Sequence, residues 1–302
     1  MLFIGSPCSD EGTVGLHPNL NRAAIFDYLH YVVEEHARKI NARVIVWKDF
    51  ADADRKPLET VAKAHGLFRL ESFPGTILPL QSSDKAQYFA SLKGSRRHQV
   101  RKKLKMSHAR VALNVEVAAE PDESTLGEIC GLFWQTYEKS RTKFERLTPD
   151  FFSVAAREPS SRFVLLRTPD SGQLVAFMLC FHVGSRVINK FIGFDYARPK
   201  EWLLYFRLWE AALNWALSVN ADSVQSGQTG YAAKIEVGHQ LVRLTNYCKH
   251  RNLIVNTIYR IISRSISWKT LDPDLARFLL AHPEAGGCQQ QSPMQPGGAG
   301  RR

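Results

Sequence analysis

Charged side chains follow two short apolar segments and could act on a substrate amine. Asp195 comes directly after the aromatic-flanked run from Phe191 to Phe194, where a strand is expected to end. A carboxylate there would be partly desolvated and could accept a proton from an attacking amine. The alternative is structural, because Asp is a preferred amino-terminal cap of a helix. Trp47-Lys48-Asp49 ends another expected strand and offers a second charged pair by the same reasoning.

A second polar group follows the short strand that is expected to end at Gln225. The stretch from Ser226 to Gly238 carries Gln228 and Lys234, and ligands in open α/β sheets gather at such carboxyl ends of strands. Lys234 could hold a carboxylate or a phosphate of the substrate, or pair with Glu236 at the surface. Gln225, Gln228 and Lys234 are therefore our candidates for substrate binding.

Tyr231 lies in the same stretch and could donate a proton to a leaving group. The alternative is a packed ring whose hydroxyl reaches water. Lys234 follows Gly230 by four residues, but the pattern G-x-x-x-x-G-K-[S/T] is missing, which excludes a P-loop. Ser226 does not stand in G-x-S-x-G, so the sequence does not favour a serine hydrolase.

The loop from Asp195 to Glu201 joins an expected strand to an apolar helix. Unpaired backbone N–H groups and the helix dipole favour an anion at such a junction. Arg198 and Lys200 add full positive charges, and Pro199 stiffens the approach. We expect these two cations to bind an anionic group, with Tyr196 beside them as a further substrate-binding candidate.

A dense basic run covers residues 96–105 and suggests a phosphate-rich partner. On a helix, Arg97, Arg101 and Lys105 lie at i, i+4 and i+8 on one face, with Arg96 next to them. Leu92, Val100 and Leu104 form a separate apolar anchor. The cations could bind tRNA; the alternative is a solvated face, because aromatic residues for base stacking are not interleaved after Phe89.

Amphipathic helices and short strands must position these residues. Helical spacing of apolar residues predicts helices that cover residues 22–40 and 126–137. From Trp202 to Leu217 the pattern is inverted, because Arg207, Glu210, Asn214 and Ser218 form one narrow polar stripe on an apolar helix, so that helix should be mostly buried. Short apolar, β-branched segments predict strands at 43–47, 69–73, 111–117, 163–167, 174–183, 186–194, 223–225 and 241–247. Gly184 and Ser185 predict a two-residue hairpin turn.

A weak repeat suggests that one structural unit occurs twice. Phe3-Ile4-Gly5 opens a stretch with the order loop, helix, strand and helix, and Phe191-Ile192-Gly193 opens another with the same order. Strands and helices from Val111 onward precede the second copy, whereas the first begins at Met1. The expected fold is therefore an α/β (α+β mixed-sheet) fold, partly duplicated, with a truncated first copy.

Composition limits the class of protein. The chain has 302 residues, 44% hydrophobic and 23% charged, with a net charge of +11, which favours an anionic partner. The five cysteines include no C-x-x-C pair, and the histidines form no H-E-x-x-H, so we predict free thiols and no metal. No segment is apolar over the roughly 20 residues that cross a bilayer, and no signal peptide is seen. These features predict a cytoplasmic protein.

Three segments together resemble a known family. Residues 88–105, Phe191-Ile192-Gly193-Phe194-Asp195-Tyr196 and Ser226 to Gly238 are similar to the Fem-like and BioF2-like branch of the GNAT acyltransferases, many of which carry two GNAT domains in tandem. The resemblance covers about residues 1–270 and implies transfer of an acyl or aminoacyl group to an amine. It also implies that the donor pyrophosphate binds near Arg198 and Lys200. The usual GNAT phosphate loop, Gln or Arg followed by x-x-Gly-x-Gly or Ala, is missing.

The resemblance and the residues together predict an N-acyltransferase that uses acyl-CoA as cosubstrate and an amine on a small molecule or peptide as acceptor. One alternative is a Fem-type transferase that uses aminoacyl-tRNA and acts on a cell-wall precursor. Another is a nonenzymatic binding protein on a degenerate GNAT fold. We expect a partial first domain with the basic helix at 1–105, a second domain at 106–284 and a disordered tail at 285–302.

Overall fold

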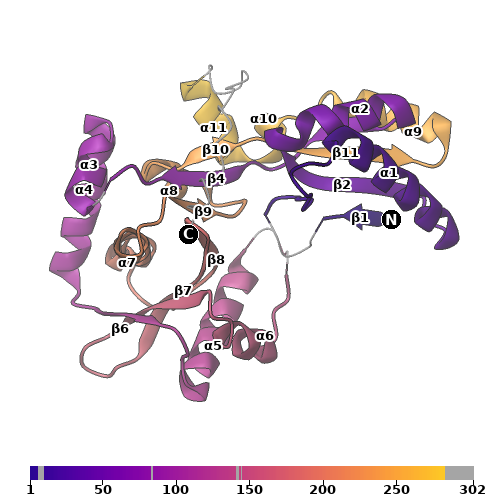
Figure 1. The fold of residues 1–302 in the computed structure, drawn as a ribbon. Coiled ribbons are helices and arrows are strands. Elements are labelled where there is room, and N and C mark those ends of the chain that lie inside the picture. Colours follow the sequence, from indigo (N-terminus) through magenta and orange to yellow (C-terminus); the bar gives the residue numbers. More distant parts are fainter. Residues whose placement is uncertain (6–9, 83, 141–142, 144, 283–302) are drawn as a thin grey trace. The chain divides into compact units, whose positions relative to one another are not determined.

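Helices and strands alternate along most of the chain, as the apolar periodicity predicts. The computed structural model describes residues 1–282 apart from 6–9, 83, 141–142 and 144 (Figure 1). The described chain forms two units, each with its own mixed sheet. Unit 1 contains Met1–Gly75, Gln228–Ala232 and the chain from Val242 on, whereas unit 2 contains Thr76–Gly227 and Ala233–Leu241. The predicted α/β class is confirmed, and the predicted tail at 285–302 lies outside the described residues.

Unit 1 begins with the predicted order of elements, in which a loop after the first strand leads to a helix, a strand and a second helix. Its elements are β1 (Leu2–Ile4), α1 (Arg22–Lys39), β2 (Val44–Ala51), the 3-10 helix η1 (Asp52–Asp54), α2 (Arg55–His65), β3 (Phe68–Glu71), β11 (Leu244–His250), α9 (Leu253–Ser263), α10 (Trp268–Leu271) and α11 (Pro273–Ala281). The sheet order is β1-β2-β11-β3, with β1 parallel to β2. Helices α1 and α2 pack on the face that carries Trp47 and Tyr247. Helix α9 packs near Phe68, which belongs to a separate, smaller cluster.

Unit 2 carries a sheet of seven strands in the order β10-β4-β9-β8-β7-β6-β5. Its elements are β4 (Gly75–Pro79), α3 (Lys85–Ser91), α4 (Gly94–Arg110), β5 (Asn114–Ala118), α5 (Glu123–Lys139), α6 (Pro149–Ala156), β6 (Ser161–Arg167), β7 (Leu174–Val183), β8 (Arg186–Phe194), η2 (Lys200–Trp202), α7 (Leu204–Ser218), β9 (Ser223–Ser226), α8 (Tyr231–Glu236) and β10 (Gln240–Val242). The first two residues of α8, Tyr231 and Ala232, belong to unit 1. Strand β8 lies in the middle of the seven-stranded sheet. Strands β7 and β8 form the predicted hairpin, and Gly184 adopts a positive φ of 60° in its turn.

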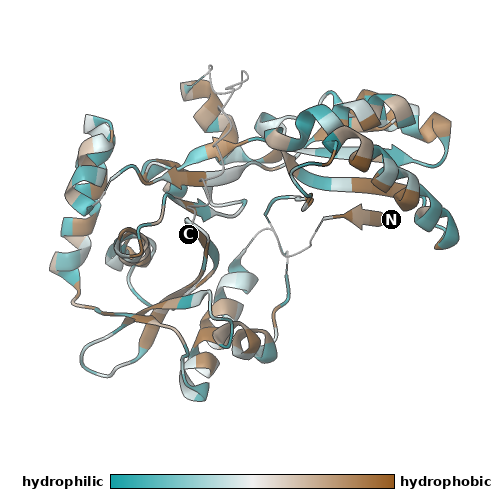
Figure 2. Ribbon diagram, viewed as in Figure 1, coloured by the Kyte–Doolittle hydropathy of each residue, from teal (hydrophilic) through white to brown (hydrophobic). Residues whose placement is uncertain are grey.

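The two faces of this sheet are covered by different helices (Figure 1). Helices α3, α4 and α7 share one cluster with Val164, Met178 and Cys180 of the strands. Helices α5 and α6 share the other with Phe163 and Phe177. Figure 2 shows hydrophobic residues along the central strands and many hydrophilic ones along α4. Because strand residues alternate between faces, the near-continuous apolar sequence of β7 is the pattern of a strand buried on both sides.

The inverted pattern of α7 is confirmed, and its polar stripe is also largely covered. Arg207 and Glu210 are buried, and Glu210 accepts from Lys85 of α3 and, at 2.8 Å, from His108 of α4. Arg207 donates to the main-chain oxygen of Val111 at 3.3 Å. Arg207 and Glu210, in the first two turns of α7, therefore hold α3 and α4 against this helix and do not face water.

Each sheet contains one strand from the other side of residue 105, the predicted division between domains. Strand β4 joins the sheet of unit 2, where Ile77 pairs antiparallel with Gln225. Strand β11 joins the sheet of unit 1, between β2 and β3. The predicted domains at 1–105 and 106–284 remain a prediction. The units of the structure draw on both sides of residue 105, because the basic helix α4 packs in unit 2.

Candidate functional site

The parallel strands β8 and β9 separate before β8 ends. Their pairing runs from Arg186 opposite Ser223 to Asn189 opposite Ser226, where the Asn189 amide donates to Ser226 Oγ at 3.3 Å. The register of β8 against β7 shifts at the next residue, Lys190, which is a β-bulge. Among the described strands, none pairs with the β9 side of the remaining residues of β8. The end of β8 is therefore a short open edge inside unit 2.

The backbone groups on this edge can be identified from the strand alternation. Asp195 donates its backbone N–H to the Val175 carbonyl of β7 at 2.9 Å, so the N–H groups of Phe194 and Ile192 point to the opposite edge. That of Phe194 donates to Thr136 Oγ1 of α5 at 3.1 Å. Ile192 therefore offers an N–H and a C=O on the edge that β9 leaves. Such groups can bind an extended ligand as an added strand would, or hold a developing oxyanion.

Helix α5 lies directly against the end of β8. A Cβ on Gly193 would come within 2.7 Å of the Leu132 carbonyl carbon and 2.8 Å of the Phe133 nitrogen. This close approach places Thr136 at Phe194, and the Gln135 side chain accepts from the Tyr196 N–H at 3.3 Å. Sequence reasoning did not identify Gln135, Thr136 or Ile192 as site residues, because their roles depend on strand register and helix packing.

Asp195 closes the loop that follows β8. Its side chain accepts from the Ala197 N–H at 3.0 Å and from Arg198 Nε at 2.7 Å, and the residue is buried. Arg198 also donates to the Gln173 side chain and lies over the Trp202 ring, 5.5 Å from its centroid. Both residues are thus engaged in the turn that leads into α7. Each could still contact a ligand by exchanging one of these bonds.

The other predicted residues of this loop are more exposed. Tyr196 is 39% exposed, and Lys139 Nζ lies 4.1 Å from its ring centroid. Lys200 is exposed at the start of η2. The basic helix α4 lies next to this junction, because Ser107 Oγ donates to the Trp202 carbonyl at 2.6 Å and Lys103 Nζ lies 4.5 Å from the Phe206 ring centroid.

The predicted residues within and after β9 are divided between the units. Gln225 is buried in unit 2, where its side chain accepts from Arg186 at 2.7 Å. Lys234, also in unit 2, donates to the Gly227 carbonyl. In unit 1, Gln228 donates to the Phe73 carbonyl at 3.0 Å, and the fully buried Tyr231 hydroxyl donates to the Pro74 carbonyl at 2.9 Å. Burial raises the pKa of Tyr231 far above its ordinary value.

His239 is a buried group near Lys234 that sequence reasoning did not select. Its backbone N–H donates to the Lys234 carbonyl at 3.0 Å, and its Nδ1 has no hydrogen-bond partner among the described residues. Burial, with a smaller effect of the Lys234 charge, lowers the pKa of His239 to about 3. It is therefore a neutral imidazole near neutral pH.

One group in unit 1 has the composition of a metal site. Ligand atoms of His30, Glu34 and His65 lie within 4.8 Å of one another. However, Trp47 donates its indole N–H to His30 Nδ1 at 3.2 Å, so the neutral imidazole carries its proton on Nε2. Glu34 accepts from Lys249 and faces His30 Nε2 at 3.2 Å. His30 Nδ1 and the Glu34 carboxylate are therefore already engaged by Trp47 and Lys249.

Residues 94–214 match the family model described as an acetyltransferase (GNAT) domain. This part of the chain is a GNAT domain. The matched range lies inside unit 2 and includes the basic helix, the open edge of β8 and most of α7. No curated protein matches the chain in sequence.

Two solved structures share the fold of most of the chain. FemX is 12% identical, with a TM-score of 0.59 over 82% of this chain and 85% of its own. L-PGS from Bacillus licheniformis is 12% identical, with a TM-score of 0.55 over 77% and 76% of the two chains. At these identities the similarity shows the fold alone. Together with the GNAT domain, it supports a transferase of acyl or aminoacyl groups, the reaction class predicted from the sequence.

The part of the chain that the structure describes contains no helix long and apolar enough to span a membrane. Three of the five cysteines, Cys130, Cys180 and Cys248, are described, and all three are buried free thiols. Burial raises the pKa of each of them. These thiols are therefore inert as nucleophiles.

Proposed function

We propose that the chain transfers an acyl group from acyl-CoA to an amine, with the donor bound along the open edge of β8. The observation that carries this proposal is the separation of β8 from β9, which leaves Ile192 backbone groups free to bind an extended chain. The amino-terminal end of α7 and the exposed Lys200 offer positive potential for the donor phosphates. A cytoplasmic location is part of the same proposal.

Positioning carries most of the catalysis in this proposal. The Ile192 N–H would donate to the carbonyl oxygen of the acyl group as negative charge develops there. The amine attacks the carbonyl carbon, the bond to the sulfur breaks, and the thiolate leaves and takes up the proton that the amine has released by way of Asp195. Asp195 is the proposed acceptor of the proton that the amine releases, after it exchanges its bond to Ala197 or Arg198.

Isothermal titration with CoA and an assay of thiol release from acyl-CoA test this function. Lys200→Glu should weaken CoA binding, and the loss should shrink as salt rises. Arg157→Glu is the matched control, because it makes the same charge change at an exposed position of unit 2. Equal CoA binding by both variants, or no binding by the unaltered protein, would contradict an acyl-CoA site at this junction.

Aminoacyl-tRNA is the second candidate donor, favoured by the position of α4 beside the start of α7. Arg101 and Lys105 of α4 are exposed, and Arg97 is half-buried. If α4 binds tRNA, the logarithm of the binding constant should fall steeply with the logarithm of the salt concentration. Replacing the three cations by Gln should flatten that slope. The acceptor would then be the amine of a peptide such as a cell-wall precursor.

Mass spectrometry of ligands that copurify with the full chain separates the donors. A bound CoA species supports the first donor and bound tRNA supports the second. A protein that binds one of them but transfers no acyl group to a panel of amines would support the nonenzymatic alternative.

A further inference from the structure

Helix α9 of unit 1 presents its apolar residues to solvent. Large hydrophobic side chains at five positions are between 48% and 74% exposed: Leu253, Ile254, Ile258, Ile261 and Ile262. The residues that α9 buries are instead polar, Asn256 and Ser263. At 100° per residue, Ile254, Ile258, Ile261 and Ile262 share one arc, on the opposite side of the helix from Asn256 and Ser263. The usual arrangement of an amphipathic helix is reversed.

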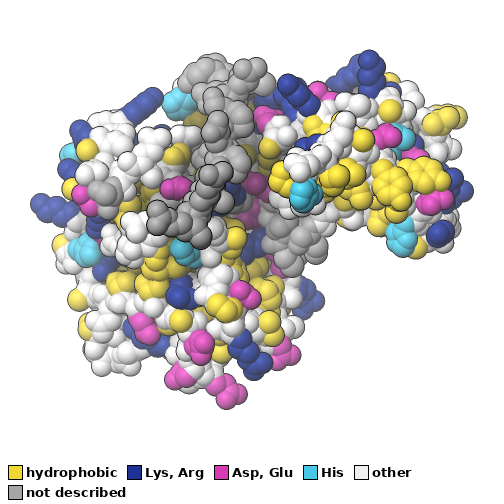
Figure 3. Space-filling model, viewed as in Figure 1, with side chains coloured by type: hydrophobic (Ala, Val, Ile, Leu, Met, Phe, Trp, Pro, Cys, Tyr) yellow, Lys and Arg dark blue, Asp and Glu magenta, His cyan; other side chains and the backbone are white. Residues whose placement is uncertain are grey.

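Polar anchors fix this orientation of α9. Asn256 donates its side-chain amide to the Gly66 carbonyl at 3.0 Å and accepts from the His250 N–H at 2.8 Å. Asn252 caps the helix by accepting from the Ile254 and Val255 N–H groups. Turning the isoleucines inward would break these bonds. The outward apolar face is therefore built into the sequence of the helix, and Figures 2 and 3 show hydrophobic residues where α9 begins.

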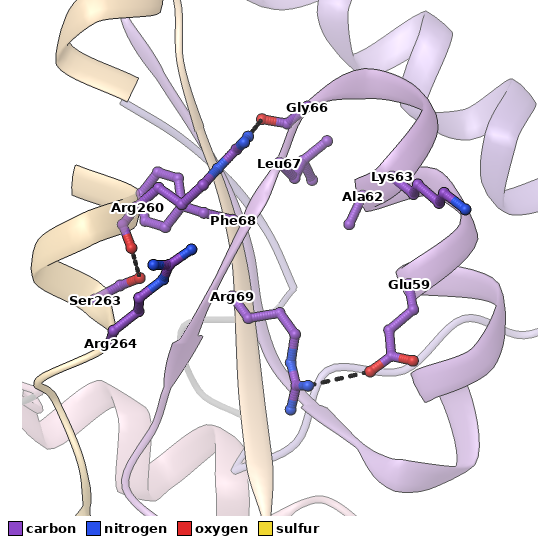
Figure 4. A pocket seen from close by; sticks show the side chains of 10 residues that line it. All are labelled: Glu59, Ala62, Lys63, Gly66, Leu67, Phe68, Arg69, Arg260, Ser263 and Arg264. Atoms are coloured by element: carbon purple, nitrogen blue, oxygen red, sulfur yellow. Dashed lines mark hydrogen bonds and ion pairs between the residues drawn. The ribbon is translucent and has the colours of Figure 1, made fainter. Parts of the chain in front are cut away.

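A hollow lined by cations lies beside this face. It has a volume of about 470 Å³ and lies next to the edge strand β3, between α2 and α9 (Figure 4). Its charged lining residues are Glu59, Lys63, Arg69, Arg260 and Arg264.

Glu59 is the only acidic residue of the described chain that lines this hollow, and two arginines already neutralise its carboxylate. Glu59 accepts from Arg55 at 2.8 Å and from Arg69 at 3.2 Å. Arg260 donates to the Gly66 carbonyl at 2.9 Å. Among the described residues, no carboxylate pairs with Lys63, Arg260 or Arg264. The hollow therefore has a net positive charge suited to a phosphate group.

We propose that α9 and this hollow form a docking surface for a membrane that contains anionic phospholipids. An exposed apolar arc flanked by arginines is the pattern of a helix that lies in the plane of the interface. Ile258 and Ile262 insert among the lipid chains, while Arg264, on the adjoining side of the helix, binds a headgroup phosphate. The charge of the hollow selects an anionic membrane over a second copy of this chain, whose net charge is +11.

Flotation of the full chain with vesicles tests this surface. Binding should require phosphatidylglycerol in a phosphatidylcholine vesicle. It should weaken when salt rises from about 0.1 M to about 1 M, because the Debye length falls from ~10 Å to ~3 Å. Equal binding to pure phosphatidylcholine, or no binding to either vesicle, overturns the proposal.

Two sets of variants locate the contact. The double change Ile258→Ser and Ile262→Ser should weaken vesicle binding about tenfold or more. Tyr28→Ser with Val32→Ser is the control, because these exposed residues lie on α1, which packs on the opposite face of the sheet. Unchanged thermal midpoints confirm that the variants fold. Equal loss in both pairs overturns the assignment to α9.

Charge variants separate the hollow from general basicity. Lys63→Gln and Arg264→Gln should each weaken binding about fivefold, as expected for a basic residue near an anionic surface. Lys39→Gln removes an exposed charge of α1 and should have a smaller effect. Sedimentation velocity tests whether the face binds a second copy of the chain instead. If the chain self-associates, Ile258→Ser abolishes this association and no vesicle binding is seen, the membrane proposal is overturned.

Discussion

Asp195 combines a predicted chemical role with an observed structural one. Its carboxylate holds the loop after β8 through Ala197 and Arg198. A side chain that closes a loop and a side chain that accepts a proton look alike in sequence, because both place Asp after a strand. The structure adds the partners, and these allow the two roles to be separated.

We predict that Asp195→Asn lowers turnover by roughly 100- to 10,000-fold if the carboxylate is the base. The amide oxygen of Asn can still accept from Ala197, so the loop should persist. Arg198→Gln is the matched control, because it breaks the same ion pair and leaves the carboxylate in place. Steady-state kinetics should show a loss of kcat for the first variant and a raised KM for the donor for the second. Equal kinetic losses in both variants would assign Asp195 to the loop alone.

Two buried histidines make the stability of the fold dependent on pH. Burial lowers the pKa of His30 to about 4, against a smaller opposing effect of Glu34, and lowers the pKa of His239 to about 3. In the unfolded chain both should titrate near ~6.5. Below that pH the unfolded chain binds protons that the folded chain does not bind. The free energy of unfolding is therefore highest above pH ~6.5 and falls toward pH ~4.

We predict that His239→Gln reduces this dependence. Each buried histidine contributes a slope of up to about 1.4 kcal/mol per pH unit below pH ~6.5. Urea unfolding at several pH values should therefore give a shallower curve for the variant than for the unaltered protein. His98→Gln, at an exposed position of α4, should leave the slope unchanged. A variant curve parallel to that of the unaltered protein would show that His239 does not titrate in this range.

At the scale of elements, the contact between α5 and β8 depends on one glycine. Gly193→Ala should destabilise the protein by about 1–3 kcal/mol, because the new methyl group would meet the α5 backbone and the Phe177 ring. Gly131→Ala, on the same helix with nothing within 4 Å of an added Cβ, should instead stabilise it by roughly 0.5–1 kcal/mol. Thermal unfolding measures both. A neutral Gly193→Ala would mean that α5 can move away from β8 without cost.

Sequence periodicity predicted those elements that have one apolar face or are wholly apolar. The ranges of β7 and β8 were predicted to the residue, and the buried helix α7 was predicted from its polar stripe. Strand β4 was missed because it is short, begins with Gly75 and ends with Pro79. The range 241–247 was predicted as one strand, but it contains parts of β10 and β11. Helix α9 was also missed, although its apolar residues recur at helical spacing.

The candidate site was predictable only in part. The sequence indicated the loop after β8, because charged residues cluster between a strand and an apolar helix. It did not indicate the open edge, because the point at which two strands separate depends on their register and on the bulge at Lys190. It also did not show that Tyr231 and Gln228 belong to unit 1, whereas Asp195 and Lys234 belong to unit 2.

At the scale of the whole molecule, each sheet is completed by a strand from a distant part of the chain. The repeated unit places a parallel pair in both sheets, β1 with β2 and β8 with β9. Beside each pair lies a strand from the other half of the chain, β11 in one sheet and β4 in the other. Since β4 precedes all the other strands of unit 2 and β11 follows all the other strands of unit 1, a cut through the middle of the chain removes a strand from each sheet.

We therefore predict that residues 72–241 form a folded fragment and that residues 106–284 do not. The first fragment keeps β4 against β9, the buried Val100 and Leu104 of α4, and the Tyr88 hydroxyl that donates to the Val237 carbonyl. The second lacks β4 and most of α4, so it exposes the edge of β9 and the α4-covered side of α7, and its β11 has neither β2 nor β3 to pair with. Unpaired edges and exposed apolar faces favour aggregation. Circular dichroism and size-exclusion chromatography should show a monomer with a cooperative thermal transition for 72–241 and aggregates for 106–284. Cooperative unfolding of the second fragment would mean that its sheet is stable without the strand it takes from the first half of the chain.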